Sequence, residues 1–235
     1  MSRLDALRAS VLDANLELVR CGLVIHAFGN ASGIDRDEGL VVIKPSGVPY
    51  DRLTPESLVV TDLQGRVVQG DLRPSSDLPT HLALYQAFTG IGGVAHTHSR
   101  HATAWAQAGR EIPCFGTTHA DYFRGAVPVT QALTPAEIES DYEWNTGQVI
   151  VRRFASLDPV ECPAVLVRHH APFCWGATPG EAAHNADILE QVAAMAWQTV
   201  LLNPHAGGIP VMLRDKHFLR KHGPGAYYGQ HQKKC

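Results

Sequence analysis

Short apolar runs separated by glycine and proline constrain the fold of this chain more than any other feature of its sequence. Four such runs, rich in β-branched residues, follow an amphipathic stretch at 4–21 that predicts a helix. Runs this short, bounded by turn residues, are typical of β-strands. Gln64 and Gly65 separate the last two runs and favour a hairpin, so that pair is expected to be antiparallel. The predicted strands cover residues 23–25, 40–44, 58–61 and 66–69.

Helical patterns and two further buried strands fill the rest of the chain. Thr178, Pro179 and Glu181 are typical cap, first and third residues of a helix, which is predicted to run to residue 202. Strands inside and helices outside predict an α/β fold, a single-domain layered α/β/α sandwich with a largely antiparallel central sheet. No linker or repeat divides the chain, so we expect one domain at 1–230 and a disordered tail at 231–235. The other predicted helices lie at 78–88, 101–108, 135–142 and 149–154, and the other strands at 94–98 and 164–167.

Composition and charge exclude several classes of function. A formal net charge of −3 gives no basic field, which argues against a nucleic-acid partner. The longest apolar run is much shorter than the roughly 20 residues of a membrane span, so no membrane association is expected. The five cysteines are widely spaced and odd in number, which favours reduced thiols in a cytoplasmic protein.

Thirteen histidines are the unusual feature of the composition, and two of them suggest a metal site. His96 and His98 are two residues apart in a predicted strand, so their side chains are expected on one face. His170 follows another predicted buried strand. Three imidazoles and a carboxylate suit Zn²⁺, with Mn²⁺ or Co²⁺ as substitutes. The alternative is a solvated strand face.

The nearest carboxylate is that of Asp77, which the local sequence favours as the cap of the helix that begins near Leu78.

Tight turns with short polar side chains form a second group. Backbone N–H groups in such turns, with hydroxyl and amide donors, suit an anion such as phosphate, although each turn alone is more simply a turn. The candidates are Gly29, Asn30, Ser46, Gly47, Ser75 and Ser76, with Lys44 adjoining.

Two further segments carry titratable groups. The loop at 116–123 contains Asp121, a candidate acid or base. Near the C-terminus lie His217, Tyr227 and Tyr228, which the local sequence explains equally well as a docked tail.

Taken together, these segments resemble the class II aldolase/epimerase family. The resemblance covers nearly the whole chain, and this many motifs in order are highly specific. It is carried by GN at 29–30, VIKPSG at 42–47, PSSDLPTH at 74–81, HTHSRHATAWAQAG at 96–109, GTTHADYF at 116–123, YEWNTG at 142–147, HHAPFCWG at 169–176, DKHFLRKHG at 215–223 and AYYGQ at 226–230.

The resemblance implies a role for each of these groups. It implies a divalent metal, normally zinc, on the three histidines with Asp77 alongside, and an acid/base pair of Asp121 and Tyr228. It also implies a homotetramer with sites between subunits, in which His217 and Tyr228 come from a neighbour. Phosphate and substrate contacts are implied for Gly29, Asn30, Lys44, Ser46, Gly47, Ser75 and Ser76, with Thr117 and His217 near the acid/base pair.

Within the family, the epimerase branch is the better match. It implies the interconversion of L-ribulose 5-phosphate and D-xylulose 5-phosphate by cleavage and re-formation of the C3–C4 bond, in the use of L-arabinose or of L-ascorbate. The alternative enzyme is a class II sugar-phosphate aldolase of the L-fuculose 1-phosphate type, in which a glutamate is expected at the position of Asp77. A third alternative is a domain without enzymatic activity, as in adducin-like relatives.

Overall fold

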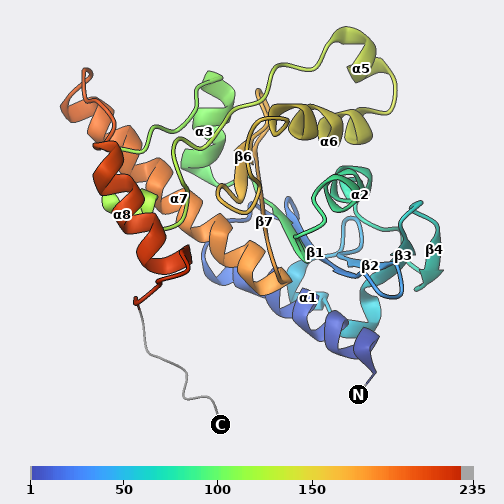
Figure 1. Cartoon of the computed structure of the whole chain (residues 1–235). Helices are drawn as coiled ribbons and strands as arrows, with labels where there is room; N and C mark the ends of the chain where they lie inside the picture. Colours follow the sequence, from blue (N-terminus) through green and yellow to red (C-terminus); the bar gives the residue numbers. More distant parts are fainter. Residues whose placement is uncertain (1, 229–235) are drawn as a thin grey trace.

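The computed structural model describes residues 2–228, within which seven strands form one sheet (Figure 1). The strand order is β4-β3-β2-β1-β5-β7-β6, and every pair of neighbours is antiparallel. The predicted antiparallel sheet is therefore confirmed. The strands are β1 (Asn30–Asp35), β2 (Leu40–Ile43), β3 (Val59–Asp62), β4 (Val67–Gln69), β5 (Gly93–His96), β6 (Ala164–Leu166) and β7 (Pro172–Gly176).

Helices cover both faces of this sheet. On one face, α1 and α7 run side by side, and a Cβ added to Gly33 of β1 would lie within 3 Å of side chains from both. On the other face, Ser32 of β1 bonds to Tyr85 of α2, and α2 packs against α6. The layered α/β/α sandwich is thus confirmed. The helices are α1 (Arg3–Arg20), α2 (Leu78–Ala87), α3 (Arg100–Ala108), α4 (Thr117–Ala120), α5 (Pro135–Glu139), α6 (Tyr142–Arg153), α7 (Pro179–Leu202) and α8 (Val211–His222), with short 3₁₀ turns at Tyr50–Arg52 and Pro55–Ser57.

Local signals explain several boundaries. The Thr178 hydroxyl accepts a hydrogen bond from the Glu181 N–H at 3.1 Å, as the predicted cap of α7 requires. Gly65 has a φ of 79° in the hairpin between β3 and β4, a conformation that favours glycine. Both predictions are confirmed.

Two strand predictions need correction. Residues 23–25 form no strand, because Ile25 makes only an isolated bridge to Phe28. The strand instead begins at Asn30, inside the segment predicted as a turn. β1 lies between β2 and β5, and small or polar residues fit there because helices crowd both of its faces. The strand β7 was not predicted, since its proline and aromatic residues do not alternate with polar ones.

The predicted tail at 231–235 and the end of the predicted domain lie outside the described residues. Within 2–228, no helix combines the length and the hydropathy that crossing a membrane requires.

Candidate active site

One cleft collects most of the residues predicted to bind metal and phosphate. It has a volume of about 440 Å³ and lies where β1, β2 and β5 meet the start of α2 and the turn between β6 and β7. Eleven predicted site residues line it: Gly29, Asn30, Lys44, Ser46, Gly47, Ser75, Ser76, Asp77, His96, His98 and His170.

The three predicted metal-binding histidines converge in this cleft. Their ligand atoms all lie within 4.8 Å of one another, and their ring centroids are 4.9 to 5.2 Å apart. His96 ends β5, whereas His98 lies beyond the strand and His170 lies in the β6–β7 turn. The prediction of one strand through His98 is therefore wrong, and the loop brings that imidazole inward instead. His169, next to His170, has a left-handed φ of 63°, a strained conformation of the kind that clusters at functional sites.

The protonation of two of these imidazoles fits a bound cation. The His96 Nδ1–H donates to the Pro172 carbonyl at 2.9 Å, which fixes the orientation of that ring. Nδ1 of His170 is buried and finds no hydrogen-bond partner in the described chain. Burial, followed by the neighbouring His96, lowers the pKa of both His98 and His170 to about 4. Neutral imidazoles with free lone pairs are the form that binds a divalent metal.

Asp77 lies in the cleft and does not cap α2 through its side chain. Its carboxylate accepts a hydrogen bond of 2.6 Å from the Asn30 amide, which also donates to Ser75 Oγ at 3.1 Å. Burial alone would raise the pKa of Asp77, but His96, His81 and the Asn30 amide together lower it. The side chain is thus an ionised carboxylate in the same cleft as the three imidazoles, and its lack of a hydrogen bond to the start of α2 disfavours the capping interpretation.

Lys44 supplies a buried cation to the same cleft. It is 2% exposed, and its ammonium contacts the Pro45 carbonyl at 3.4 Å and the Tyr50 ring at 4.8 Å. It forms no ion pair with any residue of the described chain, and burial lowers its pKa. The Tyr50 hydroxyl donates to the carbonyl of Gly29, whose φ of 97° favours glycine. An unpaired buried ammonium beside tight turns suits an anionic group of a ligand.

Four predicted site residues do not line this cleft: Thr117, Asp121, His217 and Tyr228. Thr117 begins α4, and Asp121 follows it. The Asp121 carboxylate contacts α8, with His217 Nδ1 at 3.0 Å and Arg220 Nη2 at 2.7 Å. Tyr228 lies beyond α8 and is 59% exposed. Figure 1 shows α8 on the side of the molecule away from β2, β3 and β4.

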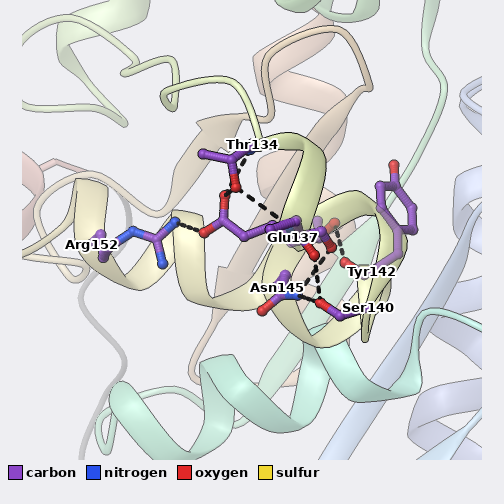
Figure 2. A network of polar contacts seen from close by, with 8 residues as sticks. Thr134, Glu137, Ser140, Tyr142, Asn145 and Arg152 are labelled. Atoms are coloured by element: carbon purple, nitrogen blue, oxygen red, sulfur yellow. Dashed lines mark hydrogen bonds and ion pairs between the residues drawn. The ribbon is translucent and has the colours of Figure 1, made fainter.

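Two residues with polar side chains that line the cleft received no role from the sequence, Tyr142 and Glu143. They begin α6, and polar contacts with α5 hold that helix in place (Figure 2). Arg152 pairs with Glu137 at 2.6 Å, and the Asn145 amide donates to the Glu137 carbonyl at 3.0 Å. The YEWNTG motif contains both residues and was the signal that could have identified them.

Comparisons with known proteins show what the whole chain is similar to. A family model described as Class II Aldolase and Adducin N-terminal domain matches residues 9–197. L-ribulose-5-phosphate 4-epimerase UlaF from Salmonella paratyphi C (strain RKS4594) is 53% identical over 227 residues, which cover 97% of this chain and 100% of that protein. The protein of the same name from Salmonella typhi gives the same identity and coverage.

Solved structures share the fold. An L-fuculose 1-phosphate aldolase superposes with a TM-score of 0.77 at 22% identity, covering 92% of this chain and 95% of that chain. YgbL from Klebsiella pneumoniae superposes with a TM-score of 0.73 at 25% identity, covering 92% and 99%. Because the family model spans most of the chain and the epimerase relatives align with nearly all of it, this chain belongs to the class II aldolase and adducin N-terminal domain family.

Proposed function

We propose that this chain interconverts L-ribulose 5-phosphate and D-xylulose 5-phosphate with a divalent metal, normally zinc. One observation carries the proposal: a single cleft combines three convergent imidazoles with an unpaired buried lysine and glycine–serine turns. A metal site and a phosphate site in one cleft suit a small sugar phosphate. The epimerase relatives, 53% identical, support this choice within the family. The retained imidazoles argue against an adducin-like domain without enzymatic activity.

The chemistry requires a carbon–carbon bond to break. The C4 hydrogen of a ketopentose phosphate lies beside no carbonyl group, so deprotonation cannot readily invert C4. Cleavage of the C3–C4 bond and re-addition to the other face of the aldehyde inverts it. A divalent metal held by His96, His98 and His170, with Asp77 alongside, supplies Lewis acidity toward the sugar oxygens next to that bond.

The chain's own residues hold the substrate and move the protons. Lys44 and the turns at Gly29, Ser46 and Ser75 are proposed to hold the phosphate, which keeps the aldehyde in place while it turns over. A proton leaves the C4 hydroxyl of one epimer and returns to that of the other, so the reaction needs two acid/base groups. The proposed pair is Asp121 and Tyr228, with Thr117 and His217 beside it.

A homotetramer with sites between subunits would bring this pair to the metal cleft. In one chain the pair belongs to the α4–α8 region and does not line the cleft. A row of large apolar side chains on α7 and α8 is exposed in the single chain, as expected of a surface that another copy covers. These side chains are Met195, Trp197, Leu201, Leu202, Val211, Met212 and Leu213. We propose a cytoplasmic location for this assembly.

The test is incubation of the purified, zinc-loaded protein with L-ribulose 5-phosphate. Formation of D-xylulose 5-phosphate supports the proposal, and removal of the metal with a chelator should abolish it until zinc is restored. Accumulation of two- and three-carbon fragments without the epimer would instead support a sugar-phosphate aldolase.

A further inference from the structure

Asp121 is held by a two-point contact with α8. The Arg220 guanidinium donates from Nε to Oδ1 at 3.0 Å and from Nη2 to Oδ2 at 2.7 Å. Two parallel hydrogen bonds fix both the position and the plane of a carboxylate, which a lysine ammonium cannot do. The orientation of Asp121 therefore depends on Arg220.

Tyr228 is attached to the same residue. The Arg220 carbonyl accepts hydrogen bonds from the N–H groups of Tyr227 at 3.0 Å and Tyr228 at 3.1 Å. The guanidinium carbon of Arg220 lies 4.7 Å from the centre of the Tyr228 ring and the Lys221 ammonium lies 4.6 Å from it, both within range of a cation–π contact. Because this ring is largely exposed, these contacts account for much of its placement in the chain.

We propose that Arg220 is a positioning residue that joins Asp121 and Tyr228 into one rigid acid/base unit carried by a single subunit. The inference rests on the proposed function, in which these two residues exchange protons with the C4 hydroxyl. It adds that the two groups reach a neighbouring cleft together, because the one residue that holds the Asp121 carboxylate at two points also contacts the Tyr228 ring and backbone.

Docking of α8 alone does not explain these contacts. Phe218 is 5% exposed and anchors the helix in the protein, and Arg124 contacts Asp215 at 3.4 Å. Neither contact involves Asp121 or Tyr228. The helix thus has attachments that do not involve these two groups, and the Arg220 side chain is directed at the two predicted acid/base groups.

The charges around Asp121 favour its ionised form. Arg220 and His217 contact its carboxylate, and the Lys221 ammonium is 4.0 Å away; His222 bonds to its backbone carbonyl. Burial alone would raise the pKa of Asp121, but the hydrogen bonds from Arg220 and His217 and the charge of Lys221 lower it overall. Loss of the guanidinium should therefore raise this pKa and move the acid limb of the rate profile to higher pH.

The test compares Arg220→Gln and Arg220→Lys in the zinc-loaded oligomer, alone and combined with Asp121→Asn and Tyr228→Phe. Arg214→Gln is the matched control, because Arg214 lies on the same helix and pairs with Asp215. We expect Arg220→Gln to lower kcat by about 10²-fold with little change in KM or zinc content, since misplaced groups cost rates of that order. Arg220→Lys should lower kcat less than Arg220→Gln does. When Asp121→Asn and Tyr228→Phe are already present, adding Arg220→Gln should lower kcat further by less than about twofold. The reason is that the effects of residues that act as a unit are not additive.

Hydrogen exchange of the peptide that contains Tyr227 and Tyr228 provides a readout independent of activity. Arg220→Gln should accelerate its exchange, and Arg214→Gln should not. Unchanged exchange, or an equal loss of kcat in the single and combined backgrounds, would overturn the inference. A wild-type protein that does not convert L-ribulose 5-phosphate contradicts the proposed function instead, and the exchange result still decides the positioning role.

Discussion

At the scale of single residues, the three imidazoles carry the most testable claim. Replacing His98 with alanine removes one of the three proposed ligands, so water must complete the coordination and the metal should bind more weakly. We expect both zinc per subunit and turnover to fall together, as measured by atomic emission and by the epimerisation assay. His205→Ala, an exposed histidine beyond α7, should keep both at the wild-type level. Full zinc occupancy with normal turnover in His98→Ala would disprove the ligand assignment.

Lys44 offers a second test at this scale. Lys44→Met removes a buried ammonium but keeps most of the side-chain volume. A hydrogen bond to a charged group is worth about 1.5–3 kcal/mol, so KM for the sugar phosphate should rise about tenfold or more. Zinc content should not change, and the melting temperature should hold or rise because an unpaired buried charge is costly. Unchanged KM in a folded, zinc-loaded variant would rule out the phosphate role.

Most cleft residues could be predicted because they occur in short, specific motifs. The pairing of Asn30 with Asp77 could not be, since those residues are 47 positions apart and meet only when α2 packs over β1. Asn30 was predicted to bind phosphate, whereas its amide donors are used by Asp77 and Ser75. Local sequence shows which donors are present, but tertiary packing decides which acceptor each of them meets.

At the scale of secondary-structure elements, a carboxylate of α7 holds the start of α3. Glu190 accepts hydrogen bonds from the backbone N–H groups of His101 at 2.9 Å and Ala102 at 3.0 Å, and His101 Nδ1 lies 2.8 Å away. A side chain from a distant part of the same chain thus caps α3, the helix that follows the loop containing His98. Burial alone would raise the pKa of Glu190, but these hydrogen bonds lower it overall.

Glu190→Gln should therefore destabilise the protein in a pH-dependent way. Folding lowers the pKa of this carboxyl, whose value in the unfolded chain is about 4.3. Its ionised form therefore stabilises the folded protein fully above that pH, and the contribution is lost as the pH falls through the pKa of the folded state. We expect the free energy of unfolding of Glu190→Gln, measured with denaturant, to be about 1–2 kcal/mol below that of the wild type at pH 7. This difference should become smaller below about pH 4.3. Asp187→Asn, whose carboxylate bonds to Gln191 on the same helix, is the control. A deficit that stays constant over this range would exclude the ionised cap.

Elements with regular patterns were the predictable ones. The hairpin of β3 and β4 and the start of α7 carry their own turn and capping residues, so local chemistry specifies them. β1 has no apolar alternation, because Gly33 must admit two helices on one face and Ser32 must bond to Tyr85 on the other. That strand depends on its neighbours, and no local pattern predicts it.

At the scale of the whole molecule, two clusters of predicted site residues lie apart in the chain: the three imidazoles of the cleft, and Asp121 with Tyr228. Their separation predicts complementation between subunits. His98→Ala lacks a proposed metal ligand, and Tyr228→Phe lacks a proposed acid/base group from the α8 region, so each homo-oligomer should have a strongly reduced turnover. Co-expressed mixed oligomers should recover up to about a quarter of wild-type turnover if random neighbours combine one intact copy of each cluster. Mixing Asp121→Asn with Tyr228→Phe is the control and should recover nothing, because Arg220 links both residues within one chain. Failure to recover activity in verified mixed oligomers would place the whole site in one subunit.

The sheet order also has a consequence for biosynthesis. His96 ends β5, whereas His170 lies in the turn between β6 and β7, which a ribosome makes much later. A nascent chain that has emerged only as far as α3 carries two of the three imidazoles, one fewer than a stable metal site requires. Under the proposed ligand assignment, capture of the metal therefore waits until the last hairpin of the sheet has been made, so unfinished chains should bind the ion more weakly than complete ones.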